Sequence, residues 1–202
     1  MTDLLNNPSS FLALVGLFFC SIGFIFIRRE KITNRQLVFS ALMLALAVLL
    51  QQLRLFHMPQ GGSVTAGAML PLLLVSFIYG PALGMLTGFV YGFLNMLLDP
   101  YILHPIQVLF DYPLPFMAMG LAGFFRSKLL LGTAIAFLAR FICHFLSGII
   151  FFANFAPEGM PAWLYSLGFN GSFLSAEFII CIILLKLLPI ARIIKAVGDF
   201  KS

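Results

Sequence analysis

Long apolar runs separated by short polar stretches dominate the sequence. Seven of these runs are long enough, or nearly so, to cross the roughly 30 Å hydrocarbon core of a bilayer as helices. They span approximately residues 11–27, 36–56, 66–80, 81–99, 103–125, 130–154 and 165–188. The third run is short, so we expect either a tight helical hairpin with the fourth or a tilted, partly re-entrant segment. The pattern predicts an all-α integral membrane protein.

Composition supports membrane lipid as the main solvent. Apolar residues make up 61% of the 202-residue chain and charged residues only 9%, against about 25% charged in an average soluble domain. The formal net charge of +5 does not indicate nucleic-acid binding, because ten of the twelve basic residues fall in three short clusters beside apolar runs. These clusters are Arg28, Arg29, Lys31 and Arg35; Arg126 and Lys128; and Lys186, Arg192, Lys195 and Lys201.

The basic clusters also predict an orientation. Basic loops remain preferentially on the cytoplasmic side, which places loops 28–35 and 126–129 and the tail from Lys186 inside. The N-terminus is then outside and the C-terminus inside, with seven spans. The first run could be a signal peptide, but its positive charges follow the apolar stretch and no cleavage site is evident. We therefore expect residues 1–35 to form an anchor helix with a basic loop, and residues 36–202 a six-helix core with a short basic tail.

Small residues recur at helical spacing on two of the runs. Gly84, Gly88 and Gly92 form one stripe, and Ala41 and Ala45 form a shorter one. Such stripes let helix backbones approach closely in lipid. Internal packing is the favoured interpretation for the glycines, whereas the alanine pair could equally contact another subunit.

Four ionisable residues lie inside the predicted spans, where charge is costly and calls for a partner or a function. They are Asp111, Arg140, His144 and Glu177. Arg140 and Glu177 fall near the midplane and predict a buried ion pair, although Arg140 could instead reach Asp111. Asp111 and His144 share the outer half of the membrane and lie near several aromatic residues. A carboxylate, an imidazole and aromatic rings could receive a cationic aromatic ligand, but an Asp–His hydrogen bond inside a bundle would have the same pattern.

Signs of catalysis or cofactor binding are weak. The cysteines match no metal or redox spacing, and no phosphate-binding loop occurs, so ATP hydrolysis is not expected of this chain. Ser147, three residues after His144, raises the alternative of an intramembrane hydrolase. No separately presented nucleophile accompanies it. We expect a non-enzymatic protein without cofactors.

Several local strings, in order and with matching spacing across residues 36–190, resemble a known family. They are Met58–Val64, His104–Tyr112, His144–Gly148 and Phe155–Gly159, followed by Trp163, Tyr165 and Asn170. Together they resemble the thiamin-specific substrate-binding component of energy-coupling-factor (ECF) transporters. The resemblance implies a six-helix membrane subunit that binds thiamin in an outward-facing pocket. It also implies partners: a transmembrane coupling subunit and two cytoplasmic ATPase subunits.

The resemblance further implies positions for the site. The acidic ligand-binding residue falls on Asp111, the pocket histidine on His144, and the tyrosine and asparagine of the last helix on Tyr165 and Asn170. A second tyrosine falls on Tyr101. The family's stacking tryptophan falls on Phe152, and a small residue beside the ligand falls on Gly148. Docking to the coupling subunit would use Ala41 and Ala45. A related subunit for another vitamin is the alternative within transport.

Overall fold

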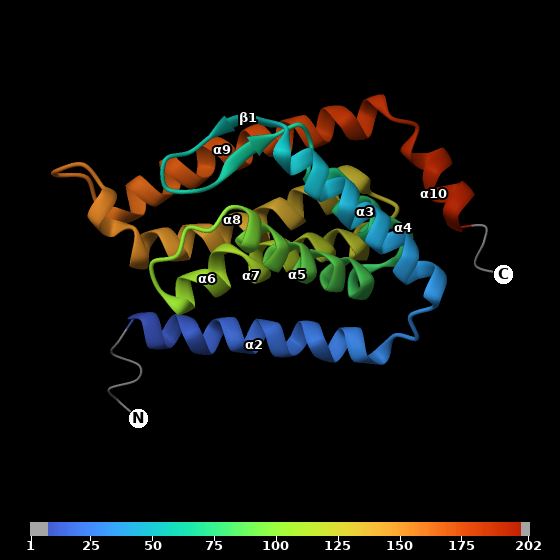
Figure 1. Cartoon of the computed structure of the whole chain (residues 1–202), viewed down its shortest axis with the longest axis horizontal. Coiled ribbons are helices and arrows are strands. Elements are labelled where there is room, and N and C mark those ends of the chain that lie inside the picture. Colours follow the sequence, from blue (N-terminus) through green and yellow to red (C-terminus); the bar gives the residue numbers. More distant parts are fainter. Residues whose placement is uncertain (1–7, 199–202) are drawn as a thin grey trace.

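The structure, a computed structural model, describes residues 8–198; Asp3 in the N-terminal segment and Lys201 in the basic tail lie outside this range. Five continuous helices and one broken helix in the described chain are long and apolar enough to cross a membrane. The continuous ones are α2 (Pro8–Arg29), α3 (Asn34–Gln52), α5 (Pro81–Leu98), α8 (Leu129–Phe151) and α9 (Ala162–Leu187). The bundle is elongated, with α2 along one side and α9 along the other (Figure 1). The predicted all-α membrane architecture is confirmed.

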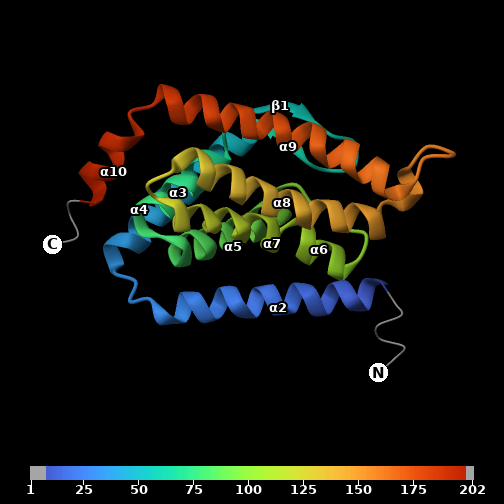
Figure 2. The same ribbon diagram turned by 180° about the vertical axis from the view of Figure 1, so that it is seen from behind.

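The third apolar run forms only a short helix, α4 (Met69–Tyr79). Eleven residues rise about 16 Å, roughly half of the hydrocarbon thickness. A β-hairpin of β1 (Arg54–His57) and β2 (Ser63–Thr65) precedes α4 and lies beside α9 (Figures 1 and 2). The sequence analysis expected a short third segment here, and α4 is joined to α5 through Gly80 alone. At about half the hydrocarbon thickness α4 is not a seventh full span, and the strands before it were not predicted. Irregular backbone at this depth is tolerated because α4 is almost entirely buried in protein.

The fifth run is broken at its prolines into α6 (Pro105–Asp111), α7 (Pro113–Met117) and the 3-10 helix η1 (Ala118–Phe125). Proline lacks an N–H donor and its ring clashes with the preceding turn, so Pro113 ends the helical hydrogen bonding that begins in α6. Tyr112, with φ −121° and ψ −82°, forms the junction. Asp111 therefore lies at the end of a short helix and not in the middle of a long one.

The glycine stripe on α5 packs against this broken helix. A Cβ atom on Gly88 would meet the backbone of Phe116, and one on Gly92 would meet the backbone of Tyr112 and Pro113. A side chain at either position would push the two helices apart. Internal packing, the favoured interpretation of the stripe, is confirmed.

The N-terminal helix α2 is attached to one side of the bundle (Figure 2). Its buried stripe is Leu12, Gly16 and Gly23. A Cβ atom on Gly16 would lie 2.7 Å from Leu109 Cδ2 and 2.8 Å from a ring atom of Phe110, so this glycine is needed for close approach to α6. The rest of α2 is largely exposed, as expected for a helix that faces lipid.

Two shorter helices complete the described chain, and the loops gather at the two ends of the bundle. The 3-10 turn η2 (Ala153–Phe155) follows α8, and the short helix α10 (Ile190–Gly198) follows α9. The connection from α2 to α3 lies at the same end of the molecule as α10 (Figure 1). Arg126 belongs to this end too, because its guanidinium lies against Gly80 in the turn between α4 and α5. The basic clusters thus gather at one end of the bundle.

Candidate functional site

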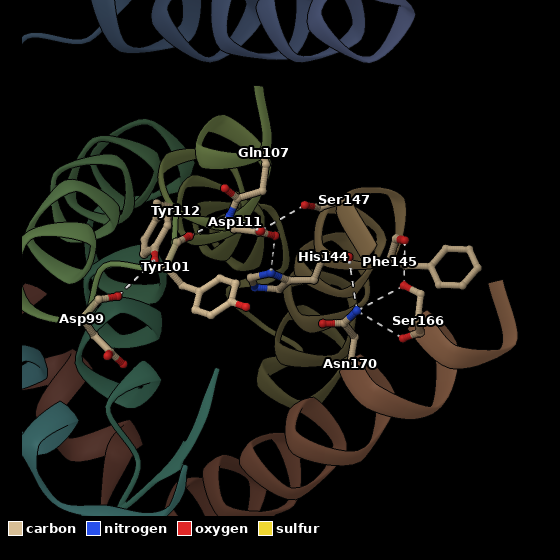
Figure 3. A network of polar contacts seen from close by, with 10 residues as sticks. All are labelled: Asp99, Tyr101, Gln107, Asp111, Tyr112, His144, Phe145, Ser147, Ser166 and Asn170. Atoms are coloured by element: carbon tan, nitrogen blue, oxygen red, sulfur yellow. Dashed lines mark hydrogen bonds and ion pairs between the residues drawn. The ribbon is translucent and has the colours of Figure 1, made fainter. Parts of the chain in front are cut away.

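A cavity of about 70 Å³ with a polar and aromatic lining lies between α5, α6, α8, α9 and the β-hairpin. All seven residues expected to bind a ligand line it: Tyr101, Asp111, His144, Gly148, Phe152, Tyr165 and Asn170. Asp111, His144 and Asn170 come from three different helices and point toward one another (Figure 3). The break after α6 and the packing of α8 on α9 place them together.

The Asp111 carboxylate is the centre of the site. Its Oδ2 atom accepts hydrogen bonds from Gln107 Nε2 at 2.6 Å and Ser147 Oγ at 3.0 Å. Its Oδ1 atom lies 3.2 Å from His144 Nδ1. The side chain is only 16% exposed. Among the described residues, no lysine or arginine forms an ion pair with this carboxylate, and its neighbours are the hydrogen-bonding groups of Gln107, Ser147 and His144.

His144 is oriented by Asp111 and has an unused nitrogen. If the ring is neutral, the contact at 3.2 Å assigns the proton to Nδ1, which then donates to Asp111 Oδ1. His144 Nε2 is buried and has no hydrogen-bond partner among the described residues. Buried polar atoms are usually satisfied, so one left without a partner beside a cavity points to a ligand group that donates to it.

Asn170 closes the side of the site formed by α9. Its Nδ2 atom lies within hydrogen-bonding distance of His144 O at 3.2 Å and of Ser166 O at 3.1 Å. These contacts direct the amide nitrogen to the backbone and the amide oxygen away from it (Figure 3). Gly148 lies directly opposite, where a Cβ atom would collide with Ser166 and come within 3.0 Å of Asn170 Nδ2. The glycine is therefore needed for close packing of α8 on α9 as well as lining the cavity.

Aromatic rings form the wall at the end of α8. Tyr101 and Phe152 are stacked, with ring centroids 5.7 Å apart and planes 22° apart. The Tyr101 backbone is held by Tyr112, whose hydroxyl accepts from Tyr101 N at 2.6 Å and donates to Asp99 O at 3.0 Å. Tyr165 is half-buried and packs on Phe169 at 5.8 Å. The backbone contacts fix Tyr101 in the wall.

A buried ion pair lies deeper, as predicted for the midplane. Arg140 Nη1 donates to Glu177 Oε2 at 2.7 Å, and Thr65 Oγ1 donates to Glu177 Oε1 at 2.7 Å. The Arg140 guanidinium also lies 4.7 Å from the centroid of the Phe116 ring. Arg140 therefore pairs with Glu177 and not with Asp111, which decides between the two partners that the sequence left open.

Charge at the other edge of the cavity is also compensated. Arg54 Nη1 lies 3.1 Å from Asp99 Oδ2, and His57 Nδ1 lies 2.9 Å from Ser63 Oγ. The first contact links the hairpin to the end of α5, and the second joins the two strands of the hairpin. With both Asp99 and Glu177 paired to arginines, Asp111 is the one carboxylate in the described membrane-spanning helices without an arginine or lysine partner.

Two residues that bond Asp111 were missed or misinterpreted by the sequence analysis. Gln107 was not considered, although it lies one helical turn before Asp111 and its spacing could have indicated a contact. Ser147 was considered only as a possible nucleophile. Its hydroxyl donates to Asp111 and not to His144, so the arrangement does not form the serine–base contact that activates a nucleophile.

Ala41 and Ala45 lie away from the cavity, on the outer face of α3, where both are exposed. Apolar side chains surround them on this face, including Val38, Leu42 and Leu49, each more than 60% exposed. Trp163 is half-exposed and does not line the cavity.

Comparison with known proteins places these features in a family. The sequence matches the family described as thiamine transporter protein (Thia_YuaJ) over residues 37–196, which leaves α2 outside the matched region. It is 37% identical to the thiamine transporter ThiT of Bacillus subtilis, over 76% of this chain and 89% of that protein. It is 29% identical to ThiT of Lacticaseibacillus paracasei, over 57% of this chain and 68% of that protein.

A solved structure of ThiT from Listeria monocytogenes is also similar in fold. It has a TM-score of 0.66 at 25% sequence identity, covering 76% of this chain and 94% of the other. Six apolar helices and these bacterial relatives identify a multi-pass protein of a bacterial cell membrane. The chain belongs to the thiamine transporter protein (Thia_YuaJ) family.

Proposed function

We propose that this protein binds thiamin in the cavity beside Asp111 and serves as the substrate-binding subunit of an ECF-type importer. The observation that carries the proposal is the Asp111 carboxylate, which is nearly buried, accepts hydrogen bonds from Gln107 and Ser147, lies beside His144, and has no lysine or arginine partner among the described residues. A buried anion without a counter-ion stabilises a cationic guest. Thiamin has a permanently cationic thiazolium ring, so its charge matches this site.

The neighbouring groups match the rest of the ligand. Tyr101 and Phe152 supply aromatic faces for the thiamin rings, with cation–π attraction of roughly 0.5–2 kcal/mol per ring. The unpartnered His144 Nε2 can accept from the ligand's hydroxyl or amino group. Asn170 can hydrogen-bond the pyrimidine edge, and Tyr165 extends the wall on α9. The family membership of the chain supports the same ligand.

Binding specificity tests this proposal directly. Calorimetry and thermal unfolding of the purified protein should show tight binding of thiamin and a higher melting temperature in its presence, because ligand binding to the folded state stabilises it by mass action. Riboflavin and biotin, which lack a cationic ring, should produce neither effect. A protein that binds riboflavin or biotin and ignores thiamin would be a subunit for another vitamin.

Transport requires partners, and the exposed face of α3 is the proposed docking surface. The face around Ala41 and Ala45 is apolar and exposed, with small side chains at the two alanines, and no other described helix of the bundle covers it. Small residues there would let a helix of the coupling subunit approach closely, while two ATPase subunits supply the energy. The cytoplasmic side of the membrane would face the basic end of the bundle, with the N-terminus outside.

A paired substitution separates docking from binding. Ala41→Trp should block co-purification with the coupling subunit and thiamin uptake while leaving thiamin affinity unchanged. Ile179→Trp, at a similarly exposed position on α9, is the matched control and should leave all three unchanged. Normal assembly of the Ala41→Trp protein would exclude this face.

A further inference from the structure

A second cavity, with an apolar lining, separates α2 from α8. Its volume is about 330 Å³, and its floor is formed by α7 and η1. Val15 and Phe26 mark its two ends on α2, and Ala139 and Leu146 lie across from them on α8. We call this space the α2–α8 cleft. It is distinct from the polar cavity beside Asp111, which lies on the opposite side of α6 and α8.

The cleft exists because α2 rests on only part of the bundle. Its buried stripe of Leu12, Gly16 and Gly23 faces α6 and α7, while α8 runs at a distance from it. Side chains at the cleft mouth remain accessible: Phe19 is 54% exposed and Ile142 is 47% exposed. The cleft is therefore continuous with the surface that faces lipid.

The dimensions of the cleft fit a hydrocarbon chain. Val15 and Phe26 are separated by about 16 Å along α2, close to the depth of one leaflet of a bilayer with a hydrocarbon core of about 30 Å. Its volume is more than twice that of an engineered apolar cavity of about 150 Å³ that takes up benzene. Without polar groups to bond water, such a space stays dry, and its lining lacks dispersion contacts until hydrocarbon fills it.

Positive charge gathers where the cleft ends. The rings of Phe26 and Phe124 meet there edge to face, with centroids 6.0 Å apart. Arg28 and Arg29 follow Phe26 in the sequence, and Arg126 and Lys128 follow Phe124. All four basic side chains are exposed, and none has a hydrogen bond or ion pair within residues 8–198. Glu30 offsets only part of this charge.

We infer that the α2–α8 cleft binds one anionic phospholipid. An acyl chain lies along the cleft between α2 and α8, and the phosphate-containing headgroup is bound by the basic residues beyond Phe26 and Phe124. Arginine and lysine near a membrane surface each attract an anionic lipid headgroup, and arginine can bond phosphate oxygens in a bidentate manner. The lipid fills the space that the chain itself leaves open and joins α2 to the core.

Native mass spectrometry of the full-length protein, released from mild detergent after incubation with phosphatidylglycerol or phosphatidylcholine, tests this inference. We expect one phosphatidylglycerol per protein to be retained in preference to phosphatidylcholine. Arg28→Gln/Arg29→Gln should reduce that retention by about fivefold per charge removed. Lys186→Gln/Arg192→Gln, which removes two charges at the same end but away from the cleft, should leave retention unchanged.

Filling the cleft supplies an independent variant. Ala139→Phe should abolish retention of phosphatidylglycerol, whereas Leu138→Phe, on the exposed side of the same helix, should not. Thiamin binding by each variant verifies that it is folded, and the charge pair remains informative if Ala139→Phe does not fold. Three results would overturn the inference. The protein could retain both lipids equally, it could retain phosphatidylglycerol undiminished in both Ala139→Phe and Arg28→Gln/Arg29→Gln, or it could bind a second copy of the chain in place of lipid.

Discussion

The substitution Asp111→Asn removes the charge of the proposed site with little change in its shape. At a separation of about 4 Å, two unit charges attract by about 4 kcal/mol at an effective dielectric constant of about 20. A hydrogen bond to a charged group contributes about 1.5–3 kcal/mol, which gives a lower limit. Since each 1.4 kcal/mol corresponds to a tenfold change in affinity, the thiamin dissociation constant should rise by at least about tenfold and by up to about 10³-fold.

The same substitution should have a small effect on the free protein. Ser147 Oγ can rotate to accept a hydrogen bond from the newly introduced side-chain amide, and a buried charge without a lysine or arginine partner disappears. The free energy of unfolding should therefore change by no more than about 1 kcal/mol. The expected signature is an unchanged melting temperature without ligand, together with a greatly reduced stabilisation by thiamin.

Isothermal calorimetry of the purified protein measures the affinity, and thermal unfolding with and without thiamin measures both stabilities. A thiamin analogue with an uncharged ring in place of the thiazolium completes a cycle, because its affinity should be nearly the same for both proteins. Two results would refute the electrostatic reasoning: an unchanged thiamin affinity in Asp111→Asn, or an equal loss for the charged and uncharged ligands. A lower melting temperature with unchanged affinity would make Asp111 a structural residue.

Three further substitutions test other parts of the structure. Glu177→Gln should lower the free energy of unfolding by about 3–5 kcal/mol, because it leaves Arg140 buried without a counter-ion. Denaturation of the double variant Glu177→Gln/Arg140→Met should show that part of this stability is recovered. Equal stability of the single variant and the wild type would contradict a buried pair. Gly88→Ala should destabilise the bundle by about 1–3 kcal/mol, measured by thermal unfolding, because its Cβ atom would overlap with the Phe116 backbone. Gly168→Ala is the control and should not destabilise the bundle, since a Cβ atom there meets nothing within 4 Å. Phe152→Ala should weaken thiamin binding about tenfold through loss of an aromatic face, and Phe152→Trp should bind thiamin at least as well as the wild type. Equal thiamin affinities of the wild type and both variants in calorimetry would exclude Phe152 from the binding wall.

Much of the membrane architecture could be read from hydrophobicity. Apolar runs identify spans because backbone groups in lipid must be bonded within their own segment. For residues 66–80 this reasoning indicated a segment shorter than an ordinary span, and α4 is short, but the β-hairpin before it was not predicted. The short length has a physical cause: α4 is covered by protein, so it is not held to the length that lipid contact requires.

Sequence alone was enough to show that the chain lies in lipid, that Arg140 and Glu177 need compensation at the midplane, and that Asp111 and His144 share a depth. These conclusions depend on the cost of charge in hydrocarbon and on rise per residue, which are local properties. Depth alone could not choose between Glu177 and Asp111 as the partner of Arg140, because rotation about a helix axis does not change depth.

Which side chains face one another became known only from the folded bundle. The break at Pro113 leaves Asp111 at the end of α6, beside His144 and Ser147 of α8, and the close approach at Gly148 brings Asn170 beside His144. The fold also leaves the α2–α8 cleft open, since α2 packs mainly on α5, α6 and α7 and not on α8. Contacts between helices depend on their rotation and tilt, and packing of the whole bundle sets both.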